Sequence, residues 1–302
     1  MSKKNVVILG GSPLALEIGK QILVSKKLNL YGYVKEKDKD KLQGFSDYDL
    51  GTDINILSKL NPDISIALDY HKIIPAEIIS SFKIINSHGG LLPENRGYHT
   101  LGWGFINDHN ELGYTLHLMD EGLDSGDVIY TFRYPVKRNT TFSELKNAVD
   151  LDQRKNIVKV LCDFTYGKIK SKPQRIKFPK YYSKRNLSDC MIDWNNKSAF
   201  IERFIRALSV PAGPGAFTIY DAKRMTILNA ELYPCKDYLE IPGHVVYKTN
   251  DKILVKTKDK CLWIEDVIYE GNKLKAGKLI RKSGVRLGLN FTEEILKLNK
   301  II

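Results

Sequence analysis

The sequence predicts an α/β protein: a mainly parallel sheet with helices on both faces, followed by a small β-barrel domain. Apolar, strand-like runs at 5–9, 28–34 and 64–68 are separated by stretches of helical periodicity, which is typical of right-handed βαβ units. From residue 215 onward, short β-rich segments recur between Asp, Asn, Gly and Pro. A chain of 302 residues also exceeds the usual size of one domain. The expected parts are an N-terminal domain over 1–180, a linker and connecting helix over 181–210, and a C-terminal β domain over 211–302.

Composition limits the class of protein. A hydrophobic fraction of 43% is enough for a substantial core, whereas no apolar run approaches the ~18 residues of a membrane span and the start has no signal-peptide pattern. We therefore expect a cytoplasmic protein with no membrane partner. The four cysteines lack CxxC spacing, so the sequence predicts neither a metal site nor a disulfide framework.

The net charge of +12 is concentrated in one segment. Residues from Lys168 to Arg185 include eight Lys and Arg side chains and no Asp or Glu. Two interpretations remain open: this run binds RNA or another polyanion, or it is a solvated linker in a lysine-rich protein.

The first elements follow from periodicity and turn residues. A strand at 5–9 passes through the turn Gly10–Pro13 into a helix over 14–24, an arrangement whose backbone N–H groups can face an anion. The turn is not GxGxxG, which argues against a dinucleotide site. Strands follow at 28–34 and 64–68.

Residues 84–97 read IINSHGGLLPENRG and predict a buried strand that ends at a cleft on the carboxyl edge of the sheet. Asn86 and His88 are two residues apart, so an extended backbone projects both side chains from one face. Gly90 allows close approach of the backbone, and Arg96 adds a planar cation. The same residue types also make ordinary strand-to-loop turns, so on these residues alone both interpretations stay open.

The later elements are predicted in the same way. They are a helix at 101–107, strands at 113–119 and 128–136, a long helix opened by the capping box Thr141–Glu144 and extending to about Gly167, a linker at 168–190, a helix at 198–208, strands at 216–220, 225–232, 243–247, 253–257 and 261–267, and a short helix at 291–302. Residues 120–127 form a tight acidic loop. Its spacing does not fit an EF-hand, so we interpret it as a turn and predict no metal.

Two motifs in a fixed order carry a family resemblance. The first is Asn86-Ser87-His88, followed by GGLLP and by Arg96-Gly97, and the second, about 25 residues later, is GLDSGD at 122–127. Together they resemble the signature of the folate-dependent formyltransferases, which include methionyl-tRNA formyltransferase, glycinamide ribonucleotide transformylase and the amino-sugar N-formyltransferases. MIDW at 191–194, Arg206-Ala207 and PGAF at 214–217 resemble the region that leads into the C-terminal OB-like barrel of the tRNA and sugar enzymes. The similarity covers roughly 64–232 well and the rest in outline.

The resemblance implies a Rossmann-like catalytic domain, an OB-like barrel and metal-free transfer of a formyl group from N10-formyltetrahydrofolate to an amine. It implies that Asn86 stabilises the developing oxyanion through its amide NH2. His88 moves protons, and Asp124 orients and supports the imidazole or relays a proton through water.

The resemblance also places the two substrates. The residues expected at the folate are Asp69, Tyr70, Ile73, Met119, Gly122 and Leu123, and those expected at the amine substrate are Gly90, Arg96, Tyr98 and Trp103. Two departures from the family pattern bear on these contacts. The loop at 69–75 keeps the Tyr and Pro of the family but adds charge, and Gly90 stands where the family often has Ser, so a hydroxyl contact is missing.

The amine is expected to belong to a nucleotide-linked amino sugar, of the UDP- or dTDP-4-amino-4,6-dideoxyhexose or 4-amino-arabinose type. The tRNA enzymes usually have a longer N-terminal half, whereas here only about fifty residues separate the second strand from His88. Arg96 would then meet the pyrophosphate and Tyr98 or Trp103 the sugar or base, although each is equally suited to a structural role. The same family implies a possible homodimer and a place in surface polysaccharide biosynthesis.

Two other hypotheses remain. Methionyl-tRNA formyltransferase shares the motif and would explain the basic segment, although the short N-terminal half makes tRNA the less favoured partner. A non-catalytic RNA-binding protein would explain the charge alone, and the intact set of Asn86, His88 and Asp124 argues against it.

Overall fold

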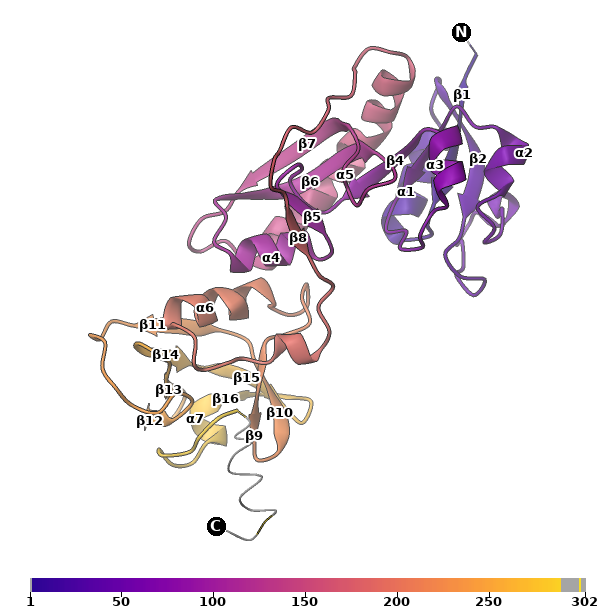
Figure 1. Cartoon of the computed structure of the whole chain (residues 1–302). Helices are drawn as coiled ribbons and strands as arrows, with labels where there is room; N and C mark the ends of the chain where they lie inside the picture. Colours follow the sequence, from indigo (N-terminus) through magenta and orange to yellow (C-terminus); the bar gives the residue numbers. More distant parts are fainter. Residues whose placement is uncertain (1, 289–298, 300–302) are drawn as a thin grey trace. The chain divides into compact units, whose positions relative to one another are not determined.

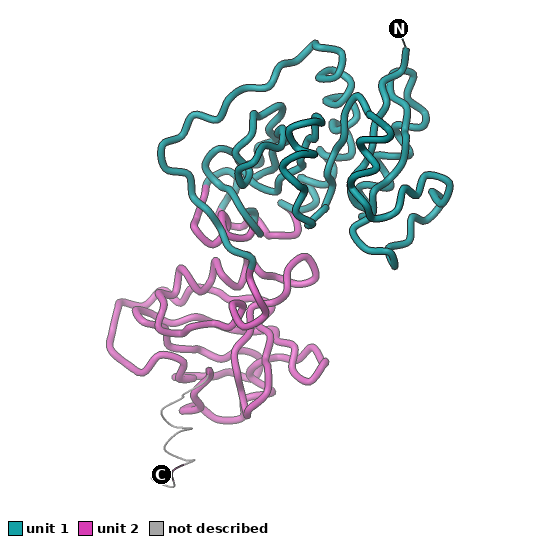
Figure 2. Tube along the Cα trace, turned by 45° about the vertical axis from the view of Figure 1, so that its right-hand side comes forward, with its two compact units in different colours: residues 1–101, 110–137, 145–184 teal, residues 102–109, 138–144, 185–302 magenta. Residues whose placement is uncertain are grey.

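The computed structural model describes residues 2–288 and 299, which form two compact units (Figure 2). The first unit consists of residues 1–101, 110–137 and 145–184, and the second of residues 102–109, 138–144 and 185–302. The helix expected at 291–302 lies outside the described residues.

A six-stranded sheet forms the centre of the first unit (Figure 1). Its strands, in spatial order, are β2 (Leu28–Val34), β1 (Lys4–Leu9), β3 (Ile64–Ala67), β4 (Ile84–His88), β6 (Glu111–Leu118) and β7 (Val128–Pro135). The pairs within β2-β1-β3-β4 are parallel, whereas β4-β6 and β6-β7 are antiparallel. The β6-β7 pair is antiparallel because the connection between these two strands is too short for the crossover that a parallel pair needs.

Helices cover both faces of this sheet, as predicted. On one face lies α1 (Pro13–Leu23), whose N-terminus is capped by Ser12 and whose Ala15 carbonyl accepts a hydrogen bond from Tyr33 (3.5 Å). On the other face, α2 (Ile56–Leu60) and α3 (Ala76–Ser81) contribute side chains to a core cluster with Val34, the next residue of β2. Neighbouring residues of a strand point to opposite faces, which explains the two layers.

The capping box predicted at Thr141 is present. The N–H of Thr141 donates to the Glu144 carboxylate (2.6 Å) and the Glu144 N–H donates to the Thr141 hydroxyl (3.2 Å), at the start of α5 (Phe142–Thr165). The predicted helix at 101–107 is α4 (Thr100–Ile106).

Residues 168–184 differ from the expected linker, because they run along the first unit. A short strand, β8 (Lys180–Tyr182), pairs in parallel with β5 (Asn95–Gly97), and Lys172 exchanges two backbone hydrogen bonds with Val128, both 2.8 Å. The basic segment therefore packs beside the strand that follows the predicted catalytic motif.

The second unit is a small β domain, as predicted, with two four-stranded antiparallel sheets. The first holds β9 (Phe217–Tyr220), β10 (Lys223–Ile227), β15 (Asp266–Tyr269) and β16 (Asn272–Lys275), and the second holds β11 (Ala230–Tyr233), β12 (Val245–Lys248), β13 (Ile253–Lys256) and β14 (Cys261–Ile264). Helices α6 (Ser198–Ala207) and α7 (Ala276–Leu279) belong to the same unit. The single strands expected at 225–232 and 261–267 are each two strands, because the chain passes from one sheet to the other within them.

Two further features concern predictions from composition. Within the described part of the chain, no helix is both long and apolar enough to cross a membrane. The four cysteines, Cys162, Cys190, Cys235 and Cys261, all carry free thiols.

Candidate active site

The candidate site lies on the face of the sheet that carries α2 and α3. Ile84, Asn86 and His88 alternate along β4 and therefore project from this face. Ile84 belongs to the core cluster, while the next two positions on the same face are polar. Directly across from Asn86 on the antiparallel neighbour β6 is His117. The apolar layer between sheet and helices thus ends in a group of hydrogen-bonding side chains.

His88 and Asp124 form the predicted pair. Nδ1 of His88 lies 3.4 Å from Oδ2 of Asp124, and their side chains are only 7% and 11% exposed. The other ring nitrogen, Nε2, lies 2.8 Å from the backbone carbonyl of Asn95. Because a carbonyl can only accept, Nε2 carries a hydrogen, and Nδ1 is the nitrogen that faces the carboxylate and can exchange a proton there.

His117 is a site residue that the sequence reasoning missed. Its Nδ1 donates to the carbonyl of Leu118 (2.8 Å), so its Nε2 is an acceptor, and this atom lies 3.2 Å from Nδ2 of Asn86. The same Nε2 is 3.6 Å from Oδ1 of Asp124. The His117 ring therefore lies close to both Asn86 and Asp124. A signal was available: His117 stands between Leu116 and Leu118 in a strand-like run, where a buried polar ring needs hydrogen-bond partners.

The backbone around Asp124 is shaped to hold its carboxylate in place. Asp124 has a left-handed φ of 52°, which a short polar side chain tolerates better than most. The N–H of Gly97 donates to Oδ2 (2.8 Å). Burial opposes ionisation, but His117, the charge of His88 and the Gly97 N–H outweigh it and hold the pKa of this carboxyl below its usual value of 3.8. Asp124 is therefore an anion at neutral pH.

The environment of His88 acts in the opposite direction. Burial lowers the pKa of the imidazole from its usual 6.5, and the nearby Asp124 and the Asn95 carbonyl only partly oppose this. His88 is therefore neutral at pH 7, as a proton acceptor must be, and the adjacent carboxylate favours the imidazolium that forms when it takes up a proton.

Arg96 lies buried beside this pair, in the strand β5 that also supplies the Gly97 N–H. Its side-chain nitrogens donate to Tyr181 (3.0 Å) and Gln174 (2.8 Å), and the guanidinium lies 5.8 Å from the centre of the Tyr181 ring. The residue is 8% exposed, its Nε has no hydrogen-bond partner, and no carboxylate among the described residues pairs with it. A buried cation without a counter-ion is costly, so an anion would be favourable here.

Gly90, which stands where the family often has Ser, cannot make a hydroxyl contact, and its role in the structure is steric. A Cβ at this position would lie 2.6 Å from Nε2 of His88 and 2.8 Å from the Asn95 carbonyl, the two atoms that bond to each other. Only glycine leaves that hydrogen bond undisturbed.

The residues predicted at the folate fall into two groups. Tyr70 and Met119 are half-buried against the core cluster that contains Ile84. Ile73 and Leu123 are exposed, at 94% and 51%, and Asp69 is exposed with a left-handed φ of 54°. Exposed apolar side chains such as Leu123, which directly precedes Asp124, suit a flat heterocycle.

The acidic loop is a turn, as interpreted. The carboxylate of Asp120 accepts hydrogen bonds from the Gly122 N–H (3.1 Å) and the Ser125 hydroxyl (2.6 Å), which fold the loop back towards β7. Among the described residues, no group of three or more His, Cys, Asp or Glu side chains is placed to hold a metal ion.

The remaining two predicted residues are Tyr98 and Trp103. Tyr98 belongs to the first unit and is 43% exposed. Trp103 belongs to the second unit, where the guanidinium of Arg185 lies 4.9 Å from its ring centre. The structure therefore brings together Asn86, His88, Asp124, Gly90 and Arg96 from the sequence prediction, and adds His117 to them.

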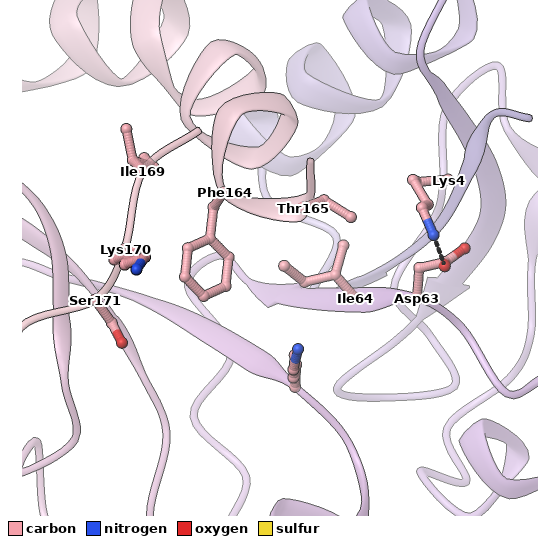
Figure 3. A pocket seen from close by; sticks show the side chains of 9 residues that line it. Lys4, Asp63, Ile64, Phe164, Thr165, Ile169, Lys170 and Ser171 are labelled. Carbon is pink, nitrogen blue, oxygen red and sulfur yellow. Dashed lines mark hydrogen bonds and ion pairs between the residues drawn. The ribbon is translucent and has the colours of Figure 1, made fainter. Parts of the chain in front are cut away.

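A cavity of about 460 Å³ lies elsewhere in the first unit (Figure 3). It is lined by Lys4 and Ile64, the first residues of β1 and β3, and so lies at the amino edge of the parallel strands, whereas His88 is the last residue of β4. Lys4 is ion-paired with Asp63 across its wall (2.8 Å). None of the candidate catalytic side chains lines it.

Known proteins of similar sequence are consistent with this site geometry. Residues 46–161 match the formyl transferase family, and residues 185–283 match the formyl transferase C-terminal domain. The methionyl-tRNA formyltransferase of Caldanaerobacter subterraneus subsp. tengcongensis is 32% identical over 248 residues, which are 78% of this chain and 74% of that protein. The chain belongs to the formyltransferase family. The bifunctional polymyxin resistance protein ArnA of Wigglesworthia glossinidia brevipalpis is 29% identical over 255 residues, 82% of this chain and 38% of ArnA.

Solved structures share the formyltransferase fold. A sugar N-formyltransferase from Shewanella sp FDAARGOS_354 matches with a TM-score of 0.63 at 20% identity, over 76% of this chain and 99% of that one. HypX from Aquifex aeolicus, solved with tetrahydrofolic acid, matches with a TM-score of 0.61 at 20% identity, over 92% of this chain and 47% of its own. This formyltransferase is a folate-dependent enzyme, and its co-substrate is N10-formyltetrahydrofolate.

Proposed function

We propose that this formyltransferase acts on the amino group of a nucleotide-linked amino sugar, of the UDP- or dTDP-4-amino-4,6-dideoxyhexose or 4-amino-arabinose type. The observation that carries the proposal is the buried, carboxylate-free guanidinium of Arg96, one residue from the Gly97 N–H that holds Asp124. A compact diphosphate can reach a single buried cation of this kind and accept from it in a fixed geometry.

The side chains supply the chemistry that formyl transfer needs. When bound, the folate carries an activated formyl group on nitrogen. Asn86 is the oxyanion donor: one hydrogen of its amide points to His117 Nε2, and the other is free for the formyl oxygen as that atom gains charge. His88 accepts the proton of the attacking amine at Nδ1, and the carboxylate of Asp124, 3.4 Å away, stabilises the resulting imidazolium. As the bond between the formyl carbon and the folate nitrogen breaks, His88 gives this proton to the departing nitrogen, which releases tetrahydrofolate and leaves the imidazole neutral.

The residues present also fit the folate. Tyr70 and Met119 would form a half-buried floor, Ile73 and Leu123 exposed apolar walls, and Asp69 and Gly122 polar groups of the two loops. Leu123 directly precedes Asp124, so a heterocycle against it would lie next to the proton-transfer pair.

A second candidate is methionyl-tRNA formyltransferase. Two observations favour it: relatives bearing that name are 28–32% identical to this chain, and the basic segment carries exposed Lys172, Lys177 and Lys180, of which Lys180 pairs with β5. Exposed lysines suit a nucleic-acid backbone, whereas the buried Arg96 suits a small phosphate group.

The test is a direct competition between acceptors. The enzyme is supplied with N10-formyltetrahydrofolate and either a UDP- or dTDP-linked 4-amino sugar or charged initiator tRNA, and release of tetrahydrofolate is followed. We expect turnover with a nucleotide sugar. Turnover with the tRNA alone would replace the proposal with the second candidate. Arg96→Lys, which loses the fork of donors, should raise KM for the nucleotide sugar more than it lowers kcat.

A further inference from the structure

Gln174, in the basic segment, connects Arg96 to the loop that carries Asp124. Its side-chain oxygen accepts from Arg96 (2.8 Å). Its side-chain nitrogen donates to two backbone carbonyls of the acidic loop, those of Asp124 (2.8 Å) and Gly126 (2.7 Å). One half-buried amide thus bridges the guanidinium and the backbone of the acidic loop.

The chemistry of the partners fixes the orientation of this amide. A guanidinium only donates and a carbonyl only accepts, so the oxygen of Gln174 must face Arg96 and both N–H groups must face the loop. The two donors and the acceptor are all used. A side chain held at three points has little freedom to move, and a displacement at one end is transmitted to the other.

The loop needs such support. Asp124 has a left-handed φ of 52°, a conformation that non-glycine residues adopt at a cost, and in this conformation its carboxylate lies 3.4 Å from Nδ1 of His88. The Gly97 N–H holds the carboxylate, and Gln174 holds the carbonyl of the same residue. Side chain and main chain of Asp124 are therefore fixed separately, one from β5 and one from the basic segment.

We propose that Gln174 is a positioning residue that couples anion binding at Arg96 to the placement of the Asp124 carboxylate beside His88. An anion that draws Arg96 towards itself acts on Gln174, and Gln174 acts on the loop. The identity of the anion rests on the proposed function, whereas the bridge itself does not. The segment expected to be a linker is thereby part of the catalytic framework.

Two substitutions separate the ends of the bridge. Gln174→Ala removes both ends, and Gln174→Glu keeps an oxygen for Arg96 but has no N–H for the two carbonyls. Both should lower kcat by about 10- to 100-fold, because a displacement of about 1 Å is enough to cost that much. Gln174→Glu should in addition raise KM for the nucleotide sugar, since a carboxylate paired with Arg96 competes with the substrate phosphate.

The pH profile distinguishes positioning from loss of folding. The titratable groups that face His88 are Asp124 and His117. If the carboxylate moves away, the imidazolium loses its stabilising charge and the pKa of His88 falls further. The acid limb of kcat in Gln174→Ala should therefore move to lower pH, a change that a merely destabilised protein would not show.

Gln21→Ala is a matched control. Gln21 is also half-buried in the first unit and also donates to a backbone carbonyl, that of Arg154 (3.0 Å), but it lies on α1. The Gln21→Ala variant should leave both kcat and the acid limb of its pH profile unchanged.

The measurements use whichever acceptor the wild-type enzyme formylates. If that acceptor is tRNA, the proposed substrate fails while the role of Gln174 is still decided. Wild-type kcat in Gln174→Ala, or a lower kcat with an unmoved acid limb, would overturn the positioning role.

Discussion

Nδ2 of Asn86 lies 3.2 Å from Nε2 of His117, and the hydrogen between these two nitrogens belongs to the amide. The other nitrogen of the His117 ring is committed to the Leu118 carbonyl, which leaves Nε2 as an acceptor. The ring thus determines which end of the Asn86 side chain is the donor. An oxyanion donor is effective only when it is held in place before the charge develops.

His117→Leu should therefore lower kcat, because the Asn86 amide is then free to rotate. The loss of one orienting hydrogen bond, worth about 1 kcal/mol, corresponds to a reduction of about fivefold. His117→Gln, whose side-chain oxygen can accept the same hydrogen, should restore most of the rate. Single-turnover formylation at saturating folate measures the effect. Equal rates in the two variants would show that the ring does not orient Asn86.

Asn86→Ala should reduce kcat much more, by about 10²- to 10³-fold, since it removes the oxyanion donor itself. Asn86→Asp should be at least as slow, because a carboxylate repels the developing negative charge. KM for the folate should change little in both, as the interaction belongs to the transition state. If Asn86→Ala reduced kcat by less than about tenfold, the oxyanion role of Asn86 would be contradicted.

The pH dependence follows from the environments of His88 and Asp124. Since the pKa of His88 lies below 6.5, the imidazole is neutral and able to accept a proton at pH 6.5 and above, and kcat should fall only on further acidification. Asp124, with its pKa below 3.8, stays ionised throughout that range. Asp124→Asn removes the charge that favours the imidazolium, so the acid limb should move to lower pH while the plateau of kcat falls. A limb that moves to higher pH would contradict the pairing of Nδ1 with Asp124.

The sequence predicted the sheet and most of the site because both depend on local patterns. Alternation placed Asn86 and His88 on one face, and the apolar runs placed their strand in the sheet. Arg96 was found for the same reason, since it lies within the same motif. These residues are close together in the chain, so a short segment is enough to predict that they share a site.

The parts that the sequence did not predict depend on contacts between distant segments. His117 acquires its role only through the register of β4 with β6, and no pattern within residues 113–119 specifies that register. Residues 168–184 were expected to be part of a linker because this run is rich in Lys and Arg and contains no Asp or Glu. Their conformation is fixed by backbone pairing with β5 and with Val128, which precedes Lys172 by 44 residues.

Gly90 provides a test of how closely the site is packed around His88. In Gly90→Ala the new methyl would lie 2.6 Å from His88 Nε2 and 2.8 Å from the Asn95 carbonyl, and backbone cannot yield as a flexible side chain can. Overpacking of this kind typically costs about 1–3 kcal/mol, so the midpoint of thermal unfolding should fall. The hydrogen bond from His88 to Asn95 should also be disrupted, which lowers kcat. Gly89→Ala is the matched control, because its methyl would meet only the Leu101 side chain, at 4.0 Å. If both variants unfolded at the wild-type temperature and kept the wild-type kcat, the packing of the imidazole against Gly90 would have no part in catalysis.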